Sequence, residues 1–195
     1  MCSTILEMKS ESKPDLTLFK MINNIYFDLD ECLIHTEHAP FDEATHYFFT
    51  ESFGNLHLAL HPAANSVISY ARDLVGKDNV YILTTSVKEY AAEINSTCCL
   101  GFDEDHIFSR EDLNARGIEV PTCYDSFRDT LPHETAHIDN VIIDNLEPRE
   151  NKSKISFIGI DMSYKTNYLK VRGYWGVNFP NDPFETKVKE FLNES

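Results

Sequence analysis

Asp28 and Asp30 are the two side chains whose types and spacing are best suited to chemistry. They directly follow the largely apolar segment 22–27, which favours a buried β-strand. Residues i and i+2 of a strand share a face, so both carboxylates are expected to leave the end of that strand toward one point. Such a pair suits Mg2+-dependent phosphoryl transfer, in which one acid forms an aspartyl-phosphate and the other protonates the leaving oxygen.

Polar side chains also follow two later apolar runs of the chain. In parallel α/β sheets, ligands bind outside the carboxyl ends of the strands, so these polar endings are expected to meet the two aspartates in one site. Hydroxyl groups there suit a phosphate, and carboxylate and amide oxygens suit Mg2+. The residues are Thr84, Thr85 and Ser86 after the run 80–83, and Asp144 and Asn145 after the run 141–143.

The elements that position these residues are expected to form an α/β fold, a Rossmann-like parallel sheet with helices on both faces. Two short apolar-aromatic runs around the turn residues 52–55 predict a β-hairpin. Strands are expected at about 22–29, 80–83, 107–108, 141–143 and 155–160, and helices at about 62–75, 87–97 and 183–192.

The chain has 195 residues and a formal net charge of −15. This charge argues against a nucleic acid as partner, because such binding relies on Lys and Arg displacing counterions. No apolar run approaches the length of a membrane span, and the first 20 residues lack the apolar core of a signal peptide. Together with an odd number of cysteines, five, this predicts an intracellular, cytoplasmic protein with reduced thiols and no membrane partner.

Three segments of the chain resemble the motifs of the haloacid dehalogenase superfamily of phosphotransferases. The first motif is similar to that of the branch that dephosphorylates the C-terminal domain of RNA polymerase II, also called NLI-interacting-factor-like, except that Cys32 replaces the usual Thr. That branch also places a β-hairpin and then a Pro-initiated helix between its first two motifs. The three segments are Tyr26-Phe27-Asp28-Leu29-Asp30-Glu31-Cys32-Leu33-Ile34-His35, Tyr81-Ile82-Leu83-Thr84-Thr85-Ser86 and Ile142-Ile143-Asp144-Asn145.

The resemblance implies a role for each matching residue. Asp28 is similar to the nucleophile of the family, and Asp30 to its general acid and base. Thr84 matches the hydroxyl that binds a phosphate oxygen, with Thr85 as the alternative register. The family binds Mg2+ through the residues that match Asp28, the backbone carbonyl of Asp30, and the pair Asp144 and Asn145.

The third motif of the family requires a Lys or Arg that offsets charge on the transferring group. No matching Lys is evident in this chain. Arg128 stands at a suitable distance before Asp144 and is the preferred candidate. Arg110, which follows the short apolar run 107–108, is the alternative and would bind substrate.

The expected organisation is an N-terminal lead-in over residues 1–20 and a single catalytic domain over 21–195, with a hairpin insert at about 44–61. The space between Asp30 and Thr84 is too short for a large cap domain. An open site favours a phosphorylated macromolecule, a phosphoprotein above all. The alternatives are a nucleic-acid end, a small metabolite or nucleotide phosphoester, and a degenerate binding module that has kept the fold.

Overall fold

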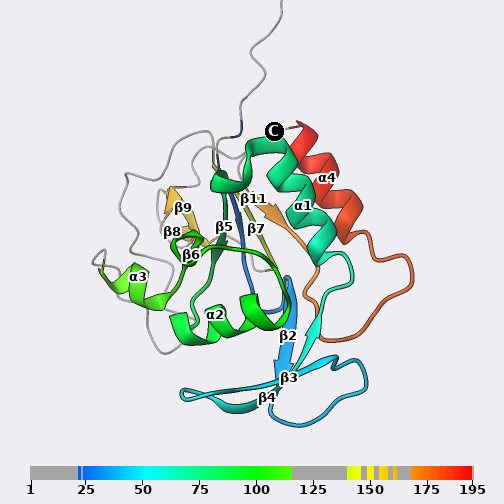
Figure 1. Ribbon diagram of the computed structural model, residues 1–195. Coiled ribbons are helices and arrows are strands. Elements are labelled where there is room, and N and C mark those ends of the chain that lie inside the picture. The colour runs from blue at the N-terminus through cyan, green and yellow to red at the C-terminus, as the bar shows by residue number, and fades with distance from the viewer. Residues whose placement is uncertain are drawn as a thin grey trace, which may run out of the picture.

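A five-stranded, entirely parallel sheet forms the centre of the fold, with the order β11-β7-β1-β5-β6. The computed structural model describes residues 22, 24–115, 140–145, 149–151, 154–157, 160–161 and 168–194. The strands of this sheet are β1 (Asn24–Phe27), β5 (Val80–Leu83), β6 (Ile107–Phe108), β7 (Asn140–Asp144) and β11 (Tyr168–Lys170). Figure 1 shows the sheet and the helices that surround it. The prediction of an α/β fold with a parallel sheet is therefore confirmed.

Strand β1 lies in the middle of the sheet because its side chains can be buried on both faces. Ile25 and Phe27 are fully buried, and Tyr26 stacks on Tyr81 of the neighbouring strand at 5.0 Å between ring centroids. In the sheet register, Phe27 pairs with Ile143 on one side and with Ile82 on the other. The residues that follow these three strands are therefore brought to the same edge of the sheet.

The predicted hairpin is present and belongs to a small antiparallel sheet of order β2-β4-β3. Its strands are β2 (Ile34–Glu37), β3 (His46–Thr50) and β4 (Gly54–Leu60). Gly54 has a φ of +73°, a left-handed conformation that glycine adopts without strain, where the hairpin turns back. Because β2 begins just after Asp30, this sheet lies beyond the carboxyl ends of the central strands, at the bottom of Figure 1.

The helices are α1 (Ala64–Val75), α2 (Lys88–Thr97), α3 (Arg110–Ala115) and α4 (Phe184–Glu194), with short 3-10 turns at Lys77–Asn79 and Glu104–His106. Helix α1 lies within the range 62–75 that the sequence predicts for a helix, and Gly76 is the residue that follows its last turn. Helices α1 and α4 lie side by side (Figure 1), and Ser66 donates a hydrogen bond to Glu185 across them. No helix among the described residues is long and apolar enough to cross a membrane.

The predicted strand at 155–160 is wrong as a member of the central sheet. That stretch forms β9 (Lys154–Phe157) and β10 (Ile160–Asp161), which pair antiparallel with each other, and β9 also pairs with β8 (Arg149–Asn151). The central sheet is completed instead by β11, which the sequence analysis missed. An apolar run indicates an extended backbone but does not specify which strand it pairs with.

Candidate active site

Asp28 and Asp144 lie next to each other at the carboxyl ends of two adjacent parallel strands. The backbone N–H of Asp28 donates to the carbonyl of Ile143 at 3.0 Å, which continues the β1–β7 ladder one residue beyond β1. Both side chains are almost completely buried, with 6% and 2% of their surface exposed. Two carboxyl groups are therefore buried side by side at adjacent strand ends.

Burial and neighbouring charge both act on the proton affinity of Asp28. Burial is the largest cause that raises its pKa well above the usual value, and the negative charges of Asp144 and Asp30 raise it further. A hydrogen bond from the backbone N–H of Leu29 opposes these effects only in part. A bound cation would favour the ionised form that a nucleophile requires.

The loop after β1 is a tight turn that fixes the direction of Asp30. The carbonyl of Leu29 accepts hydrogen bonds from the backbone N–H groups of Leu33 at 3.0 Å and Ile34 at 3.1 Å. Glu31 adopts a left-handed φ of +60°, and its N–H donates to the carbonyl of Ile34. These bonds hold the backbone of Asp30 just beyond the carboxyl end of β1. The Asp30 carbonyl is expected to bind the predicted Mg2+ there.

The carboxylate of Asp30 accepts two side-chain hydrogen bonds. Tyr90 Oη donates to Oδ1 at 2.5 Å, and Ser86 Oγ donates to Oδ2 at 2.9 Å. Burial raises the pKa of Asp30, and the hydrogen bonds from Tyr90 and Ser86 lower it. Sequence reasoning placed Ser86 at this rim but missed Tyr90, which lies in the first turn of α2.

The loop after β5 brings the second predicted motif to the same edge of the sheet. Thr84 is buried, and its Oγ1 accepts a hydrogen bond from the N–H of Ser86 at 3.1 Å. Arg110 Nε donates to the carbonyl of Thr85 at 2.9 Å, and the Arg110 N–H donates to the carbonyl of Ser86. Arg110 is thus a cation held directly against this loop, whereas Arg128 lies outside the described residues.

Asn145, just after β7, completes the set of predicted metal ligands. Its Oδ1 atom is buried and has no hydrogen-bond partner in the part of the chain that the structure describes, and the same is true of Asp28 Oδ2. A buried oxygen without a partner is costly, and a cation is one group that satisfies it. Among the described residues no group of three or more His, Cys, Asp or Glu side chains forms a ready-made metal site. The expected Mg2+ site needs no such group, because it uses an amide and a backbone carbonyl as well as carboxylates.

An acidic and aromatic rim, formed by Glu31, His35, Glu37, Phe41 and Trp175, lies beside this loop and was not predicted. The His35 ring lies between the carboxylates of Glu31 at 2.9 Å and Glu37 at 3.0 Å. Burial lowers the pKa of His35, but the hydrogen bonds and charges of the two glutamates raise it above its usual value. The two glutamates thus favour the protonated form of His35, whose positive charge offsets theirs.

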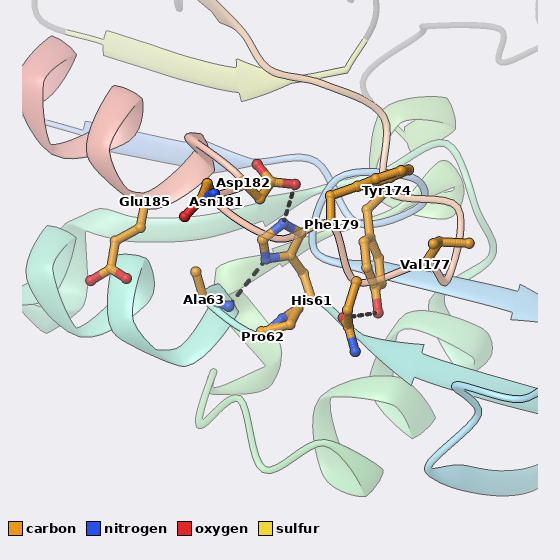
Figure 2. A pocket seen from close by; sticks show the side chains of 10 residues that line it. His61, Pro62, Ala63, Tyr174, Val177, Phe179, Asn181, Asp182 and Glu185 are labelled. Carbon is orange, nitrogen blue, oxygen red and sulfur yellow. Dashed lines mark hydrogen bonds and ion pairs between the residues drawn. The ribbon is translucent and has the colours of Figure 1, made fainter.

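A cleft of about 310 Å3 lies between the start of α1 and the segment before α4. Figure 2 shows His61 at its centre, with Nδ1 accepting from the N–H of Ala63 at 3.1 Å and Nε2 lying 3.8 Å from Asp182 Oδ2. Tyr174 forms one wall, and its backbone N–H donates to the carbonyl of Glu31 at 2.7 Å. None of the predicted site residues lines this cleft, which is joined to the loop after β1 through Tyr174 and through the backbone N–H of His61, which donates to the carbonyl of Leu33 at 2.8 Å.

Cys32 is fully buried near Asp28, with its Sγ 3.7 Å from the carbonyl of Ile143. Burial raises the pKa of this thiol well above its usual value, and Asp28 and Asp144 add to the shift. Iodoacetamide applied to the native protein is therefore expected to label the exposed Cys99 and to leave Cys32 unmodified. Peptide mass spectrometry measures both sites, with a guanidinium-unfolded sample as control. Labelling of Cys32 at the rate of Cys99 would contradict the burial described here.

The parallel α/β fold agrees with the fold that the sequence resemblance implies, and the described residues form no large cap domain. The structure is similar to that of Fcp1, an essential RNA polymerase II CTD phosphatase, with a TM-score of 0.50 and 17% sequence identity. The similarity covers 89% of this chain and 48% of the Fcp1 chain, so this chain spans about half the length of that protein.

A variant of fission yeast Fcp1 bound to beryllium fluoride is similar to the same degree, with a TM-score of 0.49, 16% identity, and coverage of 89% of this chain and 50% of the other. No protein-family model matches this chain, and no curated protein matches it. The similarity therefore concerns the fold, and the roles of individual residues stay predictions.

Proposed function

We propose that the protein is a Mg2+-dependent phosphatase that hydrolyses a phosphomonoester through an aspartyl-phosphate at Asp28. The observation that carries this proposal is the convergence of Asp28, Asp144 and Asn145 at one sheet edge, where Asp28 Oδ2 and Asn145 Oδ1 are buried and have no hydrogen-bond partner among the described residues. Asp28, the Asp30 carbonyl, Asp144 and Asn145 would hold the ion. When bound, Mg2+ supplies positive charge that offsets the negative charge of the carboxylates and the phosphate.

In the proposed reaction, an Asp28 oxygen attacks phosphorus while the bond to the leaving oxygen breaks. Asp30 gives its proton to that oxygen and afterwards removes one from the water that hydrolyses the aspartyl-phosphate. Thr84, with Thr85 beside it, provides hydroxyl contacts to the phosphate oxygens. Arg128 is the preferred candidate for the cation of the third motif. Arg110, which is bonded to the loop after β5, is the alternative source of positive charge.

The substrate proposed is a phosphorylated macromolecule, and a phosphoprotein above the other classes. The cover beside the site is the small sheet of β2, β3 and β4, which cannot enclose a ligand as a cap domain does. Tyr47 and Phe49 project from β3 with 58% and 63% of their surface exposed, which provides apolar area for contact with a large substrate. The net charge of −15 works against a nucleic acid in that place.

Phosphate release from an aryl phosphate tests the proposal directly. We expect release with Mg2+ and none with EDTA, restored when Mg2+ is added in excess. A panel of phosphopeptides, nucleotides and 3′-phosphorylated oligonucleotides then identifies the substrate class, with phosphopeptides expected to give the highest kcat/KM. Complete absence of release from every member of the panel would favour a binding module that has kept the fold.

Replacing Asp30 with Asn is expected to affect poor leaving groups most. An alkyl phosphate needs a proton on its leaving oxygen, whereas nitrophenolate leaves without one, so the first step suffers less with the aryl substrate. We expect about a 100-fold loss of kcat with the alkyl substrate and a smaller loss with nitrophenyl phosphate. Pre-steady-state measurement of nitrophenolate release isolates the first step. Equal losses with both substrates would remove Asp30 from the role of proton donor.

A further inference from the structure

A chain of hydroxyl groups holds the carboxylate of Asp30 from the side of helix α2. Tyr90 Oη donates to Asp30 Oδ1 and lies 2.9 Å from Thr36 Oγ1. A tyrosine hydroxyl has one proton, and that proton is given to Asp30, so the hydroxyl of Thr36 is the donor to Tyr90. Ser86 contacts the other carboxylate oxygen. The orientation of the Asp30 carboxylate is thus determined by two hydroxyl groups outside its own loop, one on each carboxylate oxygen.

Hydroxyl groups are well suited to a residue that must both give and accept a proton. Each carboxylate oxygen has two lone pairs, so Asp30 keeps acceptor positions for a substrate while Tyr90 and Ser86 are bound. When Asp30 carries its proton, the same hydroxyls can accept instead of donate, whereas a backbone N–H can only donate. The contact can therefore be kept through both halves of the proposed reaction.

The hairpin sheet keeps Tyr90 in place. Tyr90 is 4% exposed, and its ring packs against Phe53 at 5.2 Å and Phe48 at 6.2 Å between centroids. Next to it on α2, Glu89 accepts hydrogen bonds from the N–H of Glu51 and from Ser52 Oγ at the hairpin turn. The insert is therefore fastened to the helix turn that carries Tyr90.

We propose that Tyr90 is a positioning residue, which holds the Asp30 carboxyl group in the direction required for proton transfer, and that the hairpin insert fixes Tyr90 for this purpose. The inference rests on the proposed phosphatase function and deepens it. Tyr90 is separated from Asp30 by 60 residues in the chain, so the contact depends on the fold and not on a local motif.

The test compares Tyr90→Phe with the wild type on an alkyl phosphopeptide and on nitrophenyl phosphate. We expect the rate of the first step, measured before the steady state, to fall about 10- to 100-fold with the alkyl substrate and at most about threefold with the aryl substrate, because only the alkyl leaving group depends on a well-aimed proton donor in that step. The KM and the Mg2+ concentration for half-maximal rate are expected to stay unchanged. Tyr70→Phe is the matched control, since it also removes a hydroxyl bonded to a side chain, that of Asn193 on α4.

Thr36→Val provides a second variant that reaches Asp30 through Tyr90. It is expected to give a smaller loss with the same dependence on leaving group, and thermal melting checks that each variant folds. Equal losses of Tyr90→Phe on both substrates, or no loss on either, would overturn the positioning role while leaving the phosphatase proposal intact. Absence of turnover in the wild type, or normal turnover by Asp28→Asn, would overturn the phosphatase proposal and this inference with it.

Discussion

Replacing Asp28 with Asn is expected to leave the fold intact and to reduce phosphate release at least about 1,000-fold. The amide has nearly the volume of the carboxylate but lacks the nucleophilic oxygen and the negative charge that faces the metal. Phosphate release with saturating Mg2+ measures the loss. A rate within a few-fold of the wild type would place the nucleophile elsewhere.

The same variant is expected to melt at a higher temperature than the wild type in EDTA at neutral pH. Folding raises the pKa of Asp28, chiefly through burial, so its contribution to stability is present below the unfolded-state pKa and is lost as the pH rises through the folded-state pKa. Asn does not titrate and removes this loss. Melting curves between pH 4 and pH 8 are therefore expected to vary less with pH in the variant, and an unchanged pH dependence would contradict the burial argument.

Replacing Asn145 with Ala is expected to raise the Mg2+ concentration for half-maximal rate at least about tenfold. The buried Oδ1 of Asn145 has no hydrogen-bond partner among the described residues, as expected of an atom that binds a metal. An Mg2+ titration at fixed substrate measures the effect. Asn55→Ala is the control, because Asn55 is an exposed residue of the hairpin. An unchanged Mg2+ dependence of Asn145→Ala would show that the metal lies elsewhere.

The central strands β1, β5 and β7 could be predicted from sequence because each is a short apolar run that ends in polar side chains. Burial on both faces requires such runs, and the parallel arrangement then brings their carboxyl ends to one edge. The adjacency of Asp28 and Asp144 follows from these two facts. The hairpin was predictable for a related reason, since two apolar-aromatic runs flank a turn that contains Gly54.

The partners of side chains were not predictable in the same way. Tyr90 carries no sequence signal for a contact with Asp30, because that contact depends on how α2 packs against the hairpin. Strand β11 is only three residues long and less apolar than the stretch that forms β9 and β10, so the stronger run was assigned to the central sheet. Pairing is a tertiary property that overrides local propensity.

The attachment of the hairpin to Glu89 has a consequence for selectivity. Because Glu51 and Ser52 are bonded to the helix turn that carries Tyr90, separation of the hairpin from α2 and loosening of that turn form one local opening event. A substrate that binds the hairpin would suppress this opening. A substrate too small to reach the hairpin would leave the opening unaffected. Substrates that reach the hairpin and substrates that do not would then differ in kcat more than in KM. The protein would discriminate between them at the chemical step, after binding.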